Sequence, residues 1–293
     1  MTNAILQRQK REKNDEYYTQ YEDIKKEVLL YSTAFKNAVV YCPCDDPSWS
    51  NFYKFFCDYF DVLKLKRLVC TWLGGYRLEF DGKQVFMVFP GNDGDFRKNE
   101  IPKSENTIIC TNPPFSLFRA FRDWCGSNKI LVIGNKNALF YKNVWRSGWV
   151  YGLHKPTRFS KNGAPPENCG GLFVWYTNLT PDVPFVRKKP TLVPLNTEIH
   201  KHVDNFINTI NTDSICQIPD APDAIIAAPI NVMLLDLSDF EVLGFSSVFA
   251  LGAMRNLCTS NVGRRDVIFI NGRAKFKRVF LKRKMKCLKG EQK

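Results

Sequence analysis

No apolar run in the 293-residue sequence approaches the roughly 18 residues that cross a membrane, and the N-terminus is too polar for a secretory signal. We therefore expect a protein without membrane contact that works inside the cell, in the cytoplasm or nucleoid of a prokaryotic or viral system or in a eukaryotic nucleus. Metal-binding patterns are also missing, because Cys42 and Cys44 form no CxxC pair and His154, His200 and His202 have no matching cysteines. The ten cysteines are scattered through apolar segments, so we expect reduced thiols and no metal.

The size and charge of the chain indicate one large domain, or one domain with an appendage, that has a polyanionic partner. Hydrophobic residues make up 44% of the sequence and aromatic residues 14%, which is enough for a packed core. The net charge is +13, and residues 261–293 carry +10 of it, with twelve Lys or Arg against two acidic residues. So dense a basic segment favours a partner such as nucleic acid, and a solvated tail is the alternative.

The segment Asn112-Pro113-Pro114-Phe115 follows the apolar run of residues 107–110, which predicts a motif at the end of a buried strand. This combination suits methylation of an exocyclic amino nitrogen, a poor nucleophile whose lone pair is delocalised into its ring. The side-chain oxygen of Asn112 and the carbonyl oxygen of Pro113 are two acceptors that could draw that nitrogen toward a tetrahedral, reactive shape. The Phe115 ring offers a face for a planar base. A strand that ends in a rigid turn is the alternative.

Short apolar segments alternate with helical patterns through the first part of the chain. Strands are expected over residues 38–42, 68–72, 108–110, 130–134 and 172–176, and helices over residues 15–35, 51–60 and 116–125. This alternation predicts an α/β fold with a mostly parallel, doubly wound sheet. Ser50 suits the N-cap of the second helix, and Asp81-Gly82 marks a hairpin. The polar turns 43–50 and 111–116 follow strands, so both are expected at the ligand-binding edge of the sheet.

The end of the chain predicts a basic β-hairpin over residues 264–286. Asn271-Gly272, a strong hairpin signal, separates the alternating runs 266–270 and 273–281. We expect the apolar residues of both runs to face the body of the protein and the basic residues to contact phosphates. The candidate nucleic-acid contacts are Arg273, Lys275, Lys277, Arg278, Lys282, Arg283 and Lys284.

Taken together, these segments resemble the EcoRI-type adenine-specific DNA methyltransferase family. The matching pieces occur in order at residues 16–24, 44–52, 94–97, 111–119, 133–138 and 175–179. The resemblance covers residues 15–180 well, and more weakly the region around Ala228-Pro229-Ile230 and the basic hairpin. It implies a class I, Rossmann-like fold that uses S-adenosyl-L-methionine without a metal. It also implies site-specific methylation of N6 of an adenine that is flipped out of double-stranded DNA.

The resemblance further implies roles for individual residues. The donor pocket would be lined by Tyr18, Thr19, Asp45, Asp46, Ser50, Asn51, Asp95 and Phe96. Asp95 would accept a hydrogen bond from the donor's adenine and Phe96 would stack on it, while residues 112–115 would form the methyl-acceptor site. One departure is the turn PCDDPSWS, which lacks the glycines usual after the first strand. Either Asp45 or Asp46 could therefore hold the donor's ribose or amino group, and a solvated turn is the alternative for these acids.

The expected organisation has three regions: a loosely ordered N-terminus over residues 1–14, a catalytic domain over residues 15–180, and a DNA-binding, target-recognition region over residues 181–293. Base contacts are expected from loops within residues 140–260. The candidates are Trp145, Arg146, Trp149 and Arg158, with core packing as the alternative for both tryptophans.

Two other functions are compatible with the sequence. The same motif occurs in methyltransferases that act on RNA amino groups, and a basic tail suits RNA as well as DNA. A non-catalytic nucleic-acid-binding protein on a methyltransferase scaffold is the second alternative, which the glycine-free turn favours. The sequence leaves open the recognition sequence, the number of strands modified, the oligomeric state, the host and any partner nuclease.

Overall fold

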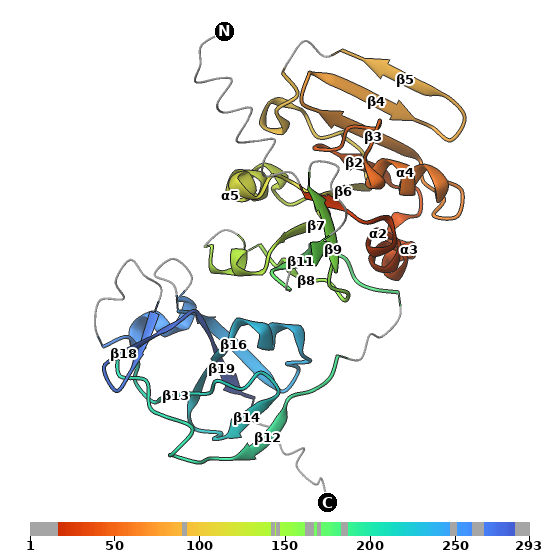
Figure 1. The fold of residues 1–293 in the computed structure, drawn as a ribbon. Coiled ribbons are helices and arrows are strands. Elements are labelled where there is room, and N and C mark those ends of the chain that lie inside the picture. The colour runs from red at the N-terminus through yellow and green to blue at the C-terminus, as the bar shows by residue number, and fades with distance from the viewer. Residues whose placement is uncertain are drawn as a thin grey trace, which may run out of the picture. The chain divides into compact units, whose positions relative to one another are not determined.

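The chain forms two compact units, residues 1–138 with 146–185, and residues 139–145 with 186–293. A computed structural model (Figure 1) describes residues 17–89, 93–141, 144, 147–161, 167–168, 171–182, 187–246, 251–259 and 267–284. The expected N-terminal region 1–14 lies outside these residues. Across the described part of the chain, every helix is too short or too polar to span a bilayer.

The first unit is built on an eight-stranded sheet in the order β5-β4-β3-β2-β6-β7-β11-β8. Its strands are β2 (Val39–Cys42), β3 (Arg67–Trp72), β4 (Tyr76–Phe80), β5 (Val85–Val88), β6 (Thr107–Thr111), β7 (Lys129–Asn135), β8 (Val150–Tyr151) and β11 (Phe173–Thr177). Strands β3, β2, β6 and β7 are parallel to one another, whereas β4, β5, β11 and β8 join through antiparallel pairs. The sheet is therefore mixed rather than mostly parallel, because the three residues between β3 and β4 are too few for a parallel crossover.

Helices cover both faces of this sheet, which confirms the predicted α/β class (Figure 1). They are α2 (Tyr21–Val28), α3 (Ser32–Phe35), α4 (Asn51–Asp58) and α5 (Phe118–Cys125), with short 3-10 turns η1 (Leu29–Tyr31), η2 (Phe96–Lys98) and η3 (Phe115–Leu117). The 3-10 turn η4 (Lys136–Phe140) begins in this unit and ends in the second. Val40 and Cys42 of β2 pack in the core with α2 and α4, while Tyr41 between them faces Trp124 of α5, with ring centroids 6.0 Å apart. Ser50 caps α4 as predicted, because its Oγ accepts from the backbone N–H groups of the first turn.

A second, three-stranded sheet lies in the same unit and was not predicted from the sequence. Its strands are β1 (Tyr17–Thr19), β9 (Arg158–Lys161) and β10 (Glu167–Asn168). The segment before β9 is anchored by two buried acids of α2. Glu27 accepts from the backbone N–H groups of Leu153 at 2.8 Å and His154 at 2.6 Å, and Asp23 accepts from that of Thr157 at 2.9 Å. These bonds place β9, and β9 in turn pairs with β1.

The second unit has a four-stranded sheet in the order β13-β15-β19-β16. Its elements are β12 (Thr191–Pro194), β13 (Thr209–Asn211), β14 (Gln217–Asp220), β15 (Ile225–Pro229), η5 (Ile230–Leu234), β16 (Phe240–Phe245), η6 (Gly252–Leu257), β17 (Val267–Ile270), β18 (Arg273–Phe276) and β19 (Arg278–Arg283). Buried residues from several of these elements, including Ala227, Met254, Ile268 and Phe280, form its core. Three of its four strands lie within residues 209–245, where no strand was predicted from the sequence.

The basic C-terminal segment differs from the long hairpin predicted over residues 264–286. Strands β17 and β18 pair antiparallel around Asn271-Gly272. Lys277 then adopts a left-handed conformation with φ of 46°, and the chain enters β19, which is paired with β15 on one side and β16 on the other. Arg278 to Leu281 are all buried, because a central strand is covered on both faces. Residues 264–266 and 285–286 lie outside the described part.

We expect Glu27→Ala to lower the free energy of unfolding by about 3 kcal/mol, because buried N–H donors lose their acceptor. Burial raises the pKa of the Glu27 carboxyl above its ordinary value of 4.5, so its protonated form is favoured in the folded state. Its contribution to stability therefore falls as pH rises through the raised pKa. In urea melts, the difference between wild type and variant should be larger near pH 5 than near pH 8. Glu22→Ala, an exposed change on the same helix, is the control.

Candidate active site

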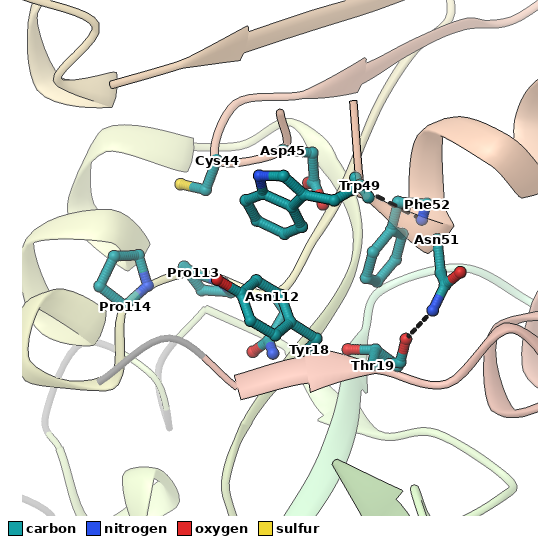
Figure 2. Close-up of a pocket in the computed structure, with 11 residues that line it drawn as sticks. Tyr18, Thr19, Cys44, Asp45, Trp49, Asn51, Phe52, Asn112, Pro113 and Pro114 are labelled. Carbon is teal, nitrogen blue, oxygen red and sulfur yellow. Dashed lines mark hydrogen bonds between the residues drawn. The ribbon is translucent and has the colours of Figure 1, made fainter. Parts of the chain in front are cut away.

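Two adjoining cavities open in the first unit at the carboxyl ends of β2 and β6, beside β1 (Figure 2). The narrow cavity has a volume of about 30 Å³, and the wide cavity has about 480 Å³. Both are lined by Tyr18, Cys44, Trp49, Asn112 and Pro114, which mark the junction of the two cavities. Ligands bind at this edge of open α/β sheets, as the sequence predicted for the two polar turns.

The structure brings together the residues predicted for the donor pocket. Thr19, Asp45, Ser50 and Asn51 line the narrow cavity, Asp46, Asp95 and Phe96 line the wide one, and Tyr18 lines both. These residues come from β1, the turn after β2, the start of α4 and the start of η2. The segments are far apart in the sequence, so their meeting is a property of the fold.

Asp45 joins the two polar turns. Its carboxylate is 5% exposed and accepts hydrogen bonds from the Ser50 hydroxyl at 2.7 Å and the Thr111 hydroxyl at 2.6 Å. Its backbone N–H donates to the carbonyl oxygen of Thr71 at 3.2 Å. Because Thr111 directly precedes Asn112, this carboxylate fixes the turn after β6 against the turn after β2.

Asp46 has a different environment from its neighbour. It is half-buried, lines the wide cavity, and accepts from the Ser48 backbone N–H at 2.9 Å and hydroxyl at 2.7 Å. These are local bonds within one turn. A carboxylate that is held in this way at a cavity wall can still accept hydrogen bonds from a ligand.

β1 forms one wall of the narrow cavity. The side-chain amide of Asn51 donates to the backbone carbonyl of Thr19 at 2.8 Å, which ties β1 to the start of α4 (Figure 2). The hydroxyl of Thr19 is buried and has no hydrogen-bond partner among the described residues. Since a buried hydroxyl without a partner is costly, this atom favours a polar group in the narrow cavity.

Asp95 and Phe96 lie beside a backbone contact that requires glycine. Gly94 has φ of 77°, and a Cβ there would lie 1.9 Å from the carbonyl oxygen of Trp72. The Arg97 guanidinium hydrogen-bonds the Asp95 carboxylate and lowers its pKa, so Asp95 is ionised at neutral pH. Phe96 is 3% exposed and packs on α5, so only part of its side chain borders the wide cavity.

The residues predicted for the methyl-acceptor site divide into two groups. Asn112, Pro113 and Pro114 line the cavities, and the Pro114 carbonyl accepts from the backbone N–H of Leu117 at 3.0 Å. Phe115 is not among the described residues that line either cavity. Its ring stacks on Phe173 of β11, with centroids 4.5 Å apart and 16° between the planes. This contact joins two segments that local sequence patterns cannot connect.

Trp49 is a site residue that the sequence reasoning missed. Its side chain is 45% exposed, lines both cavities and lies edge-on to Tyr18, with ring centroids 4.3 Å apart (Figure 2). A tryptophan inside the otherwise polar turn PCDDPSWS was the available signal.

The predicted nucleic-acid contacts have unequal environments. Arg278 is 8% exposed and bonds Asn211 and Asp213, so it stabilises the second unit from inside. Lys275 pairs with Asp213 at 2.8 Å. Arg283 pairs with Asp220, Lys284 donates to the Ser238 carbonyl, and Lys277 lies over the Phe140 ring. Arg273 and Lys282 are exposed.

The candidate base contacts are only partly described. Trp149 is buried against Phe118 and Tyr176, so it is a core residue, which was the alternative for this tryptophan. Arg158 is exposed at the start of β9. Trp145 and Arg146 lie outside the described residues.

The structure is a mixed α/β sheet with a ligand-sized cavity at the carboxyl ends of its parallel strands, which is where α/β proteins typically bind small molecules. Comparisons with known proteins identify the family. The profile of the adenine-specific methyltransferase EcoRI family matches residues 5–88 and 79–147. The type II methyltransferase M.EcoRI of Escherichia coli is 32% identical over 345 aligned residues, which cover 97% of each chain.

Two relatives from mycoplasmas are also similar. M.MpnI of Mycoplasma pneumoniae is 38% identical over 47% of this chain and 46% of its own length. M.MgeORF184P of Mycoplasma genitalium is 27% identical over 94% of this chain and 98% of its own length. No solved structure gives a significant match.

The chain belongs to the EcoRI-type adenine-specific DNA methyltransferase family. The predicted enzyme class, a site-specific DNA adenine methyltransferase, is thereby confirmed.

We expect Asp45→Ala to lower the free energy of unfolding by about 2–4 kcal/mol, because two buried hydroxyl donors lose their acceptor. Asp46→Ala, a change of the same size at the next residue, should cost under about 1 kcal/mol, since its bonds are local and half-exposed. Urea unfolding of both variants measures the difference. Similar small losses for the two variants would contradict the bridging role of Asp45.

Proposed function

We propose that the chain has the class I methyltransferase fold and transfers the methyl group of S-adenosyl-L-methionine to N6 of an adenine that is flipped out of double-stranded DNA. The junction of the two cavities carries this proposal, because Asn112 and Pro114 lie there beside Tyr18 and Trp49. A base held by residues 112–115 would meet the donor across a short distance, and such proximity supplies much of the rate of a transfer reaction. We assign residues 15–180 to catalysis and residues 181–293 to DNA binding and target recognition.

The cavities fit the donor in size and in hydrogen-bonding capacity. The wide cavity of about 480 Å³ falls within the roughly 300–1,000 Å³ of small-molecule sites. The Asp46 and Asp95 carboxylates can accept from hydroxyl and amino groups of a nucleoside, and the buried Thr19 hydroxyl can bind a polar end group. Asp46 is the acid we assign to the donor, because both oxygens of Asp45 already accept hydroxyl protons. The donor supplies an activated methyl group on a positively charged sulfonium.

The role of the protein in the proposed reaction is to hold and polarise the amino group of the adenine. The Asn112 side-chain oxygen and the Pro113 carbonyl oxygen would accept from the two N–H groups of the adenine, which turns the nitrogen lone pair toward the methyl carbon. As the new N–C bond forms, the pair of the breaking S–C bond stays with sulfur. One N–H proton then leaves the nitrogen to solvent.

Phe115 is the proposed surface for the flipped base, and an aromatic stack supports it. Phe173 stacks against Phe115, and Phe159 packs edge-on against Phe173 with centroids 5.0 Å apart. A ring backed in this way has a fixed orientation, which is what stacking on a planar base requires. N6 of a paired base cannot reach an enclosed cavity, so the adenine must leave the helix stack.

We expect Asn112→Ala to lower kcat by about 100-fold or more while the Kd for S-adenosyl-L-methionine changes less than about threefold, because the lost acceptor acts mainly in the transition state. Ser116→Ala, an exposed change next to the motif, is the control and should retain activity. The measurement is mass spectrometry of nucleosides after incubation with unmethylated plasmid DNA or RNA.

N6-methyladenine in DNA that is absent with Asn112→Ala supports the reaction, the substrate and the site together. Methylation of RNA alone would show that the substrate is RNA rather than DNA. Unchanged turnover of Asn112→Ala would show that the active site lies elsewhere. A wild-type protein that neither binds the donor nor methylates either polymer would contradict the proposed function.

The exposed basic residues of the second unit are the proposed phosphate contacts. We expect Arg273→Ala combined with Lys282→Ala to weaken binding to any duplex and to reduce the salt dependence of log K by about 0.9 for each phosphate that is no longer neutralised. Fluorescence anisotropy with a labelled duplex across a salt series measures this slope. Arg278→Ala should instead lower the thermal midpoint, because it removes a buried hydrogen-bonded charge. An unchanged slope in the double variant would place the DNA contacts elsewhere.

A further inference from the structure

The turn after β2 places an aromatic side chain where methyltransferases usually have a glycine-rich turn. Trp49 lies four residues after Asp45 and directly before the helix cap Ser50, and its ring is 45% exposed although the unit buries most of its aromatic residues. It borders both cavities and meets the ring of Tyr18 edge-on. The steps of the proposed reaction make no use of this ring.

The Trp49 ring lies between the two cavities, and the donor molecule likewise has two ends with its reactive atom between them. The donor has a nucleoside end and an amino-acid end that are joined at one sulfur atom. The wide cavity has the room and the acids for the nucleoside, and the narrow cavity has space for a small polar group. A donor bound in this way would have its sulfur at the junction of the cavities, where Trp49, Tyr18 and Asn112 lie together (Figure 2).

The charge of the cavity walls matches a cation. Within the described residues, the walls of the two cavities contain Asp45, Asp46 and Asp95 and neither lysine nor arginine. Arg97 pairs with Asp95, so the negative charge of the walls comes mainly from Asp45 and Asp46. A sulfonium carries a permanent positive charge, and a cation is attracted to the face of an aromatic ring, most strongly to that of tryptophan. After methyl transfer the sulfur is a neutral thioether, and this attraction is lost.

We propose that Trp49, braced by Tyr18, binds the sulfonium of S-adenosyl-L-methionine and so distinguishes the charged donor from the uncharged product. This inference rests on the donor site of the proposed function. Trp49 thereby takes the place of the missing glycines: the side chain, rather than a closely approaching backbone, contacts the reactive centre. The product binds more weakly than the donor, which favours its release after each transfer.

Isothermal titration calorimetry without DNA tests the proposal with Trp49→Leu and Trp49→Phe. Trp49→Leu should raise the Kd for S-adenosyl-L-methionine by about tenfold and the Kd for S-adenosyl-L-homocysteine by no more than about twofold. Trp49→Phe keeps an aromatic face and should stay within about threefold of wild type for both ligands. Trp72→Leu is the matched control, because Trp72 lines the wide cavity but not the narrow one. Its loss should weaken the binding of both ligands equally, since both carry the same nucleoside.

Equal weakening of the two ligands by Trp49→Leu would overturn the proposal, because the ring would then contribute only packing. Unchanged binding of both ligands together with a raised KM for DNA would also overturn it and would make Trp49 a surface for the target base. These outcomes leave the proposed function intact. A wild-type protein that binds neither ligand would overturn both.

Discussion

A single buried carboxylate holds the candidate site together. Asp45 accepts from Ser50 at the start of α4 and from Thr111 at the end of β6, and its backbone is tied to the end of β3. Three neighbouring strands therefore share one fixed point at their carboxyl ends. A buried charge is tolerated only where hydrogen bonds satisfy it, so these partners cannot move independently. The two turns that the proposed function assigns to the donor and to the acceptor base are consequently fixed relative to each other.

The same principle extends to the wall formed by β1. The position of this three-residue strand depends on its pairing with β9 and on the hydrogen bond from Asn51 of α4. β9 is itself placed by the bonds that Asp23 and Glu27 of α2 make with residues 153–157. The two buried acids of α2 thus accept hydrogen bonds from backbone N–H groups of a loop that lies outside the helices and strands. Tyr18 and Thr19 reach the cavities through this chain of contacts.

Local signals in the sequence predicted the parts of the structure that depend on local physics. The apolar strands, the Ser50 cap and the position of both polar turns at the sheet edge follow from residue spacing and capping chemistry. The pairing of β1 with β9 spans about 140 residues and leaves no periodic trace. The burial of Arg278 was also unpredictable, because alternation does not reveal that β19 lies between β15 and β16. The stacking of Phe115 on Phe173 is non-local in the same way.

Acidic residues line the cavities, whereas the basic residues predicted to contact phosphates lie in the second unit. The cavities are lined with aspartates and suit a cationic donor, whereas a DNA backbone is a polyanion that these acids repel. In the proposed reaction, an uncharged base would therefore enter the site while its phosphates stay outside. In the second unit, Asp213 and Asp220 pair with Lys275, Arg278 and Arg283. Three of the predicted phosphate contacts are thus neutralised within the unit. Among the described residues, affinity for DNA should depend more on exposed cations such as Arg273 and Lys282.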